Sequence, residues 1–99
     1  MEKLTLGMVT EFTQGELFDG NASTPVDGFS IDTRTLKQGN LFVALKGENT
    51  DGHRYVEAAR KAGAVAAMVS RDRVGDIRAG LPKIAVSDPL GGLQITAAR

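Results

Sequence analysis

Four polar residues with complementary chemistry lie close together in the sequence. Residues 29–32 alternate apolar and polar side chains, the two-residue period of a strand with one covered face, so Ser30 and Asp32 are expected on the same side of that strand. Thr33 and Arg34 follow at its exit. A guanidinium can grip phosphate oxygens, hydroxyls can donate to a ligand, and a carboxylate can accept from a sugar or an imide N–H. The segment therefore predicts a site for a base and a diphosphate.

A structural interpretation of the same segment is open. Asp32 and Arg34 can form an ion pair with each other and so organise a turn that needs no ligand. The two interpretations are compatible, because a guanidinium has five donors and one carboxylate does not use them all.

A second polar segment joins an expected strand to an expected helix and suits a phosphate. Its two glycines let the backbone approach a ligand closely, amide groups at the helix start can donate hydrogen bonds, and its lysine adds a positive charge. The candidate residues are Lys46, Gly47, Asn49, Thr50, Asp51, Gly52 and His53. In the structural alternative, Asp51 caps the helix, the glycines serve the turn and Lys46 is solvated.

Recognisable patterns for catalysis or metal binding are missing. His53 is the only histidine, and no pattern supplies the nucleophile or substrate proton that a general base needs. There is no cysteine, which excludes disulfides, zinc-thiolate sites and thiol catalysis. No Gly-x-x-x-x-Gly-Lys-Ser/Thr stretch is present to cradle a nucleoside triphosphate. We therefore expect no catalytic residue, no metal ligand and no cofactor of its own in this chain.

Composition limits the kinds of partner. The chain has 99 residues, and its 12 basic residues balance 12 acidic ones, which gives no long-range attraction for nucleic acid. No apolar run approaches the ~20 residues that span a bilayer, and the first residues lack the apolar core of a signal peptide. We expect one cytoplasmic domain with a single local site, bound neither to nucleic acid nor within a membrane.

The periodicity of apolar residues predicts alternating strands and helices. A short helix over 4–12 is followed by a strand at 16–18 and a loop over 19–25. Strands are expected at 29–32, 41–45, 64–69 and 83–86, with a helix ending before Gly63 and a short helix over 73–79. The run 41–45 is apolar throughout, as in a strand buried on both faces.

This order of elements predicts the fold class and the place of the site. The class is α/β, a small Rossmann-like three-layer domain with a mostly parallel or mixed sheet. In such sheets ligands bind outside the carboxyl ends of the strands, where both polar segments are expected. In the helix before Gly63, residues Tyr55, Val56, Ala59 and Ala62 share the face expected to be buried.

The last expected helix begins near Asp88 and Pro89, an N-cap and a first helical residue. Gly91 and Gly92 weaken it, since each glycine costs about 0.8–1.0 kcal/mol relative to alanine inside a helix. Its pattern still runs at Arg99, so we expect a piece cut at a domain boundary.

An ordered series of short motifs resembles the N-terminal domain of the Mur ligases. The motifs are Asp32-Thr-Arg34, Gly39-Asn-Leu-Phe-Val-Ala-Leu-Lys-Gly-Glu48, Asp51-Gly-His53, Ala58-Ala59 and Ala62-Gly-Ala64. The resemblance covers residues 29–69 and continues more weakly over 81–88 and 93–94. Within the family, the chain is most similar to ligases that add D-alanyl-D-alanine, and ligases that add the third amino acid of the stem peptide are a close alternative.

The resemblance implies a function for the two polar segments. They would hold the uridine diphosphate end of a UDP-N-acetylmuramoyl-peptide, with Ser30 to Arg34 at the nucleotide and the 46–53 loop at the diphosphate. A central domain binding ATP and Mg2+ and a C-terminal domain would complete the ligase, and neither is in residues 1–99. The chain alone is therefore expected to be inactive.

Two other functions stay open beside nucleotide recognition. The chain could act only as an interaction or scaffold domain, with a pocket too incomplete to hold ligand without its neighbours. A small independent α/β enzyme would need a nucleophile with an activating base or a metal centre, and the sequence offers neither.

Overall fold

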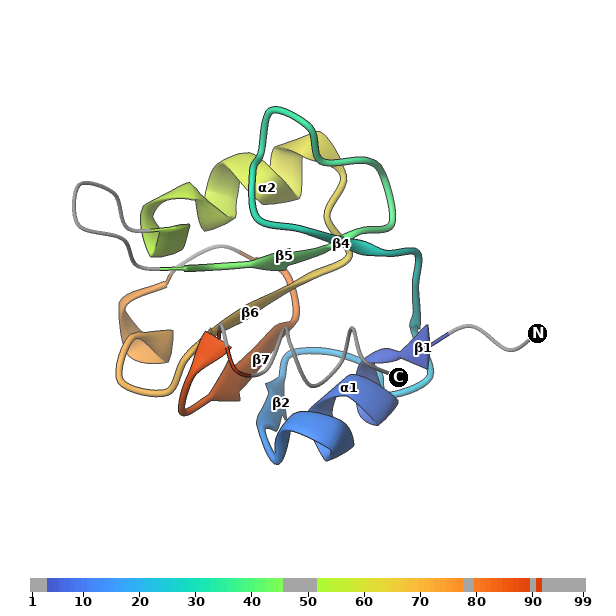
Figure 1. The fold of residues 1–99 in the computed structure, drawn as a ribbon, viewed down its shortest axis with the longest axis vertical. Coiled ribbons are helices and arrows are strands. Elements are labelled where there is room, and N and C mark those ends of the chain that lie inside the picture. The colour runs from blue at the N-terminus through green and yellow to red at the C-terminus, as the bar shows by residue number, and fades with distance from the viewer. Residues whose placement is uncertain (1–3, 46–51, 78–79, 90, 92–99) are drawn as a thin grey trace.

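The computed structural model describes residues 4–45, 52–77, 80–89 and 91 (Figure 1). Its helices are α1 (Leu6–Thr13) and α2 (Val56–Ala62), with short 3-10 helices η1 (Gly52–Tyr55) and η2 (Val74–Asp76). Its strands are β1 (Leu4–Thr5), β2 (Glu16–Phe18), β3 (Pro25–Val26), β4 (Phe29–Ser30), β5 (Leu41–Val43), β6 (Ala66–Ser70) and β7 (Lys83–Val86).

Five of the strands form one mixed sheet in the order β2-β7-β6-β5-β4. Strands β4, β5, β6 and β7 run parallel to one another, and β2 pairs antiparallel with β7 at one edge. Strands β1 and β3 make a separate antiparallel pair. The predicted α/β class with a mostly parallel sheet is confirmed, and four parallel strands end at the same edge.

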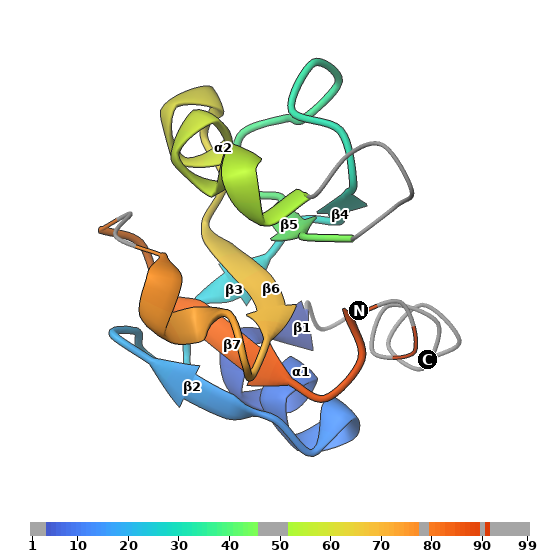
Figure 2. The ribbon, with the colours of Figure 1, turned by 90° about the vertical axis from the view of Figure 1, so that its left-hand side faces the viewer.

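The two helices cover opposite faces of this sheet (Figure 2). On the α1 face, Leu6 and Val9 pack with Leu41, Val43 and alternate residues of β6 and β7. On the α2 face, Val56 and Ala59 pack with Phe42, Ala44 and the other residues of β6. Since successive strand residues point to opposite faces, the apolar run of β5 fills both cores, as predicted.

Local chemistry fixes the ends of both helices. The Thr5 hydroxyl accepts a hydrogen bond from the Met8 N–H at 3.2 Å and caps α1. Helix α2 ends at Gly63, whose φ of 109° is a left-handed conformation that glycine adopts without steric cost. The predicted start of α1 and the predicted end of α2 lie within two residues of Thr5 and Gly63. The predicted cap Asp51 lies outside the described residues.

Four predicted elements are wrong in extent. The strand expected over 29–32 ends at Ser30, because the Ser30 hydroxyl donates to the Asp32 carbonyl at 2.8 Å and accepts from the Asp32 N–H at 3.2 Å. These bonds replace the strand ladder with a turn. Only η2 forms within 73–77, the helix before Gly63 opens with the 3-10 turn η1, and the loop over 19–25 leads into β3.

Candidate functional site

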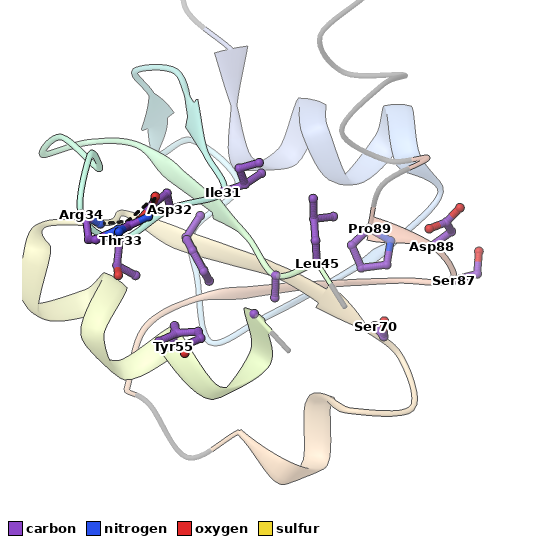
Figure 3. Close-up of a pocket in the computed structure, with 13 residues that line it drawn as sticks. Ile31, Asp32, Thr33, Arg34, Leu45, Tyr55, Ser70, Ser87, Asp88 and Pro89 are labelled. Carbon is purple, nitrogen blue, oxygen red and sulfur yellow. Dashed lines mark hydrogen bonds and ion pairs between the residues drawn. The ribbon is translucent and has the colours of Figure 1, made fainter. Parts of the chain in front are cut away.

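A pocket of about 910 Å3 opens at the carboxyl ends of the parallel strands (Figure 3). Its walls come from the turn after β4, from β5 and η1, and from the residues that end β6 and follow β7. The lining residues are Ile31, Asp32, Thr33, Arg34, Phe42, Ala44, Leu45, Gly52, Tyr55, Ser70, Ser87, Asp88 and Pro89. The pocket therefore lies at the edge of the sheet where a ligand was predicted.

The turn after β4 is built around one carboxylate. Asp32 accepts from the backbone N–H of Arg34 at 2.8 Å and from its guanidinium, with Nη2 2.9 Å and Nε 3.1 Å from carboxylate oxygens. The side chain of Arg34 is 87% exposed. The structure thus contains the predicted ion pair between Asp32 and Arg34, and both residues line the pocket. The Ser30 hydroxyl stabilises this turn through its hydrogen bond to the Asp32 carbonyl, and Ser30 does not line the pocket.

The ion pair shifts the pKa of both partners. Side-chain hydrogen bonds from Arg34 lower the pKa of Asp32 below its ordinary value of 3.8, and its backbone N–H adds to this effect. The same side-chain bonds raise the pKa of Arg34. Asp32 is therefore ionised at neutral pH and cannot donate a proton to a ligand.

Replacing Arg34 with alanine should raise the pKa of Asp32 back towards 3.8, with only the backbone N–H bond still holding it down. Because the folded pKa is the lowered one, the stability that the pair contributes is present above pH 3.8 and is lost as pH falls through the lowered value. An NMR titration of the Asp32 carboxyl carbon measures this. An Asp32 pKa that is the same in both proteins would contradict the assigned cause.

Gly52 and His53 attach η1 to the sheet. The Gly52 N–H donates to the Leu45 carbonyl at 2.7 Å, which joins the two ends of the 46–51 segment. The His53 ring is buried, and its Nε2 accepts from the Ser70 N–H at 3.0 Å. A neutral ring that accepts at Nε2 carries its proton on Nδ1. Gly52 lines the pocket, whereas His53 ties η1 to β6 and its contact with a ligand stays a prediction.

The other predicted residues of the loop lie outside the described residues. They are Lys46, Gly47, Asn49, Thr50 and Asp51. Their roles at a diphosphate stay predictions.

Sequence reasoning missed three polar residues of the pocket wall. Ser70 is the last residue of β6, and Ser87 and Asp88 are the two residues after β7, so each polar group lies at the carboxyl end of a buried strand. That position was a usable signal, because the carboxyl ends of parallel strands meet at one edge. Finding it needed the strand order, which places β6 beside β5 and β7 beside β6.

Two apolar side chains of the wall contradict their predicted burial. Ile31 was expected on the covered face of a strand and Tyr55 on the buried face of a helix. They are 58% and 47% exposed, because β4 ends before Ile31 and the buried stripe of α2 begins at Val56. Ala62, expected on the same stripe as Tyr55, is also exposed.

A family model described as "Mur ligase family, catalytic domain" matches residues 25–98, which include the whole pocket wall. The chain belongs to the Mur ligase family. The resemblance found in the motifs is thereby confirmed.

Individual Mur ligases match over most of the chain. It is 41% identical over 88 residues to the UDP-N-acetylmuramoyl-tripeptide–D-alanyl-D-alanine ligase of Escherichia coli (strain K12), covering 89% of the chain and 18% of that protein. It is 42% identical over 78 residues to a Bradyrhizobium diazoefficiens UDP-N-acetylmuramoyl-L-alanyl-D-glutamate–2,6-diaminopimelate ligase, covering 79% and 16%. A crystal structure of MurF from Acinetobacter baumannii superposes with a TM-score of 0.83 at 28% identity, covering 99% and 21%. The chain thus spans about a fifth of the length of these Mur ligases.

The described part of this Mur ligase chain does not fit ATP or a magnesium ion. Among those residues, no three His, Cys, Asp or Glu side chains are grouped so that they could hold a metal ion. The full sequence also lacks the lysine and hydroxyl residue of a P-loop after Gly52. No helix of the described residues is long and apolar enough to cross a membrane.

Proposed function

We propose that this chain recognises the uridine diphosphate end of a UDP-N-acetylmuramoyl-peptide, on behalf of a ligase that adds D-alanyl-D-alanine. The observation that carries the proposal is a pocket at the carboxyl edge of the sheet, bordered by the Asp32–Arg34 pair, in a chain of the Mur ligase family. The amide bond itself would be made by ATP- and Mg2+-binding parts of a longer ligase. The chain alone should bind without turning over ATP.

The size and polarity of the pocket support a nucleotide. Ligand sites commonly measure about 300–1,000 Å3 and combine apolar walls with a few polar groups. This pocket has about 910 Å3, and its lining includes the apolar residues Phe42 and Ala44 as well as several polar groups. In Figure 3, Asp32 and Arg34 lie at one end, and Ser70, Ser87 and Asp88 lie at the other.

Arg34 is the group best suited to a diphosphate. Its bonds to Asp32 use Nε and Nη2, and the described residues contain no other partner for it, so Nη1 is left for a phosphate oxygen. The pairing also restricts the guanidinium, so less side-chain entropy is lost when ligand binds. The ion pair and the ligand contact are thus compatible roles.

An NMR titration tests the proposal. The 15N-labelled chain is titrated with UDP and then with UDP-N-acetylmuramoyl-tripeptide, and the amides of residues 30–34, 46–53, 70 and 87–88 are followed. Saturable shifts confined to these segments are expected. No shift at millimolar ligand would reject nucleotide recognition by this chain and favour an interaction or scaffold role.

Replacing Arg34 with alanine should weaken UDP binding about tenfold, the ~1.4 kcal/mol expected for one charged hydrogen bond. The turn should persist, because the residue 34 N–H still donates to Asp32. Isothermal titration calorimetry gives both affinities. Arg60→Ala is the matched control, since Arg60 also pairs with a carboxylate, Glu57, but on α2 and away from the pocket. Equal loss in both variants would remove Arg34 from the site.

A ligase that adds the third amino acid is a second candidate. The relatives of the two kinds are 41% and 42% identical to this chain, so identity alone does not choose between them. Both need the same nucleotide end of the precursor, and UDP binding would be common to them. Assaying the full-length protein with D-alanyl-D-alanine and with diaminopimelate separates the two.

A further inference from the structure

The His53 ring is a buried titratable group that the proposed function does not use. It is 7% exposed, and its Nε2 accepts from the Ser70 N–H at 3.0 Å. This bond joins η1 to the last residue of β6. His53 is also the only histidine of the chain, so any effect of histidine protonation on this protein comes from this one ring.

The bond between His53 and Ser70 connects two walls of the pocket. Gly52 and Tyr55 of η1 line the pocket, and Ser70 lines it from the end of β6. In Figure 3, Tyr55 and Ser70 lie apart, on different elements around the pocket. The spacing of η1 and β6 at this edge therefore sets the width of the pocket. His53 fixes that spacing without lining the pocket itself.

This contact needs a neutral ring. Neutral imidazole has one nitrogen that accepts, whereas the protonated ring has a donor on both nitrogens. A protonated His53 would therefore direct an N–H at the N–H of Ser70, and the bond between them would be lost. A buried donor without its acceptor is destabilising, and burying a charge adds to the cost. Protonation therefore favours separation of η1 from β6, which lets water reach both groups.

The charged groups on the surrounding elements are mostly exposed. Among the described residues, the titratable or charged groups are Arg54 and Tyr55 on η1, Glu57, Arg60 and Lys61 on α2, Arg71, Asp72 and Arg73 after β6, and Asp88 after β7. All except the half-buried Arg73 are exposed, and Glu57 is paired with Arg60. Water and salt screen exposed charges, so we expect the bond to Ser70 to decide how protonation acts.

We propose that protonation of His53 releases η1 from β6 and thereby weakens nucleotide binding as pH falls. This inference rests on the proposed function, because it concerns the regulation of the same pocket. It makes His53 a positioning residue, which acts on the ligand through the pocket residues of η1 and β6. Histidine is the side chain whose charge ordinarily changes between about pH 5 and 8, so the response is tested in that range.

NMR on the 15N-labelled chain tests the contact without any ligand. At about pH 7.5, Nε2 of His53 should have the 15N shift of an unprotonated ring nitrogen and a scalar coupling to the Ser70 nitrogen across the hydrogen bond. On titration to about pH 5, the coupling should be lost and the amides of Ser70 and residues 52–55 should shift together with the ring. A proton on Nε2 at the higher pH, a ring that stays neutral throughout, or a coupling that survives protonation would each overturn the inference.

Two variants separate this contact from general effects of acid. Glutamine can place a carbonyl oxygen near the position of Nε2 and does not titrate, so His53→Gln keeps an acceptor for Ser70 at every pH. Leucine has no acceptor, so His53→Leu imitates the released state at every pH. Circular dichroism establishes that each variant is folded under the conditions of the binding assay.

Calorimetry with UDP then measures the effect on binding. Relative to His53→Gln, the wild type should lose at least about fivefold in affinity between about pH 7.5 and about pH 5.5, the lower end of what an unpaired buried donor costs. The comparison at each pH cancels the protonation of the terminal phosphate of UDP, which occurs in the same range. His53→Leu should bind at least about fivefold more weakly than His53→Gln already at the higher pH.

The outcomes distinguish this inference from the proposed function. If the wild type binds UDP and responds to pH as His53→Gln does, the inference is overturned alone. A folded His53→Leu that binds UDP as tightly as His53→Gln would also overturn it, because the bond to Ser70 would then not shape the pocket. A wild-type chain that binds no UDP at either pH overturns the proposed function together with the inference.

Discussion

Replacing Phe42 with alanine is expected to lower the free energy of unfolding by about 3–5 kcal/mol. Phe42 is 1% exposed and is the largest fully buried side chain of the described residues. It lies in β5, between β4 and β6, and belongs to the core on the α2 face. Several of its neighbours in this core are alanines, Ala44, Ala59 and Ala67, whose short side chains cannot move in to fill the space left by the ring.

Urea unfolding followed by circular dichroism measures this loss. A domain of this size commonly has a total stability of about 5–15 kcal/mol, so the variant should be partly unfolded at moderate temperature. Phe18→Ala is the matched control, because this phenylalanine is 38% exposed and its removal should change stability by only about 0.5 kcal/mol. A loss below 1 kcal/mol for Phe42→Ala would mean that the core on the α2 face is not packed as described.

The sequence was most informative where the pattern of apolar residues alone indicates a strand. Strands β2 and β7 have the predicted bounds, because each is a short stretch with apolar residues between turn-forming residues. Strand β5 was expected at the centre of the core, and all three of its residues are buried. These features depend on local residue types, which single-sequence reasoning can read directly.

The errors lie where one side chain replaces a regular backbone bond. Nothing in the pattern of residues 29–32 shows that the Ser30 hydroxyl will bond to the backbone of Asp32 and end β4. Ile31 then faces the pocket, although its spacing from Phe29 is that of a buried strand residue. Tyr55 is exposed for another reason, because it ends the 3-10 turn η1 and the buried residues of α2 begin at Val56.

The candidate site was predicted only in part. Asp32, Thr33, Arg34 and Gly52 were named from their residue types and all line the pocket, while their roles towards UDP stay predictions. Ser70 ends β6, and Ser87 and Asp88 follow β7, far from residues 32–34 in the sequence. They meet the others only because β6 lies beside β5 and β7 lies beside β6 in the sheet. Strand order is a long-range property that residue types alone do not determine.

Replacing Gly52 with alanine should lower stability by about 1–3 kcal/mol or more and should also weaken UDP binding. An added Cβ would lie 2.7 Å from the Leu45 nitrogen, 2.9 Å from the Leu45 oxygen and 3.0 Å from the Ala44 Cα. All three atoms are backbone, so no side chain can rotate away, and either β5 or η1 must shift. A shift of η1 would lengthen the 2.7 Å bond from Gly52 to Leu45 and move Tyr55 relative to the pocket.

Gly75→Ala is the matched control for this substitution. A Cβ at Gly75, in η2, would meet nothing within 4 Å, so this variant should be unchanged or more stable by about 0.4–1 kcal/mol through the lower entropy of its unfolded chain. Thermal unfolding and UDP calorimetry on both variants give the comparison. If Gly52→Ala were as stable as Gly75→Ala and bound UDP as tightly as the wild type, the close approach of η1 to β5 would be wrong. Loss of both properties in Gly52→Ala alone would show that one backbone contact, between Gly52 and Leu45, serves the fold and the pocket together.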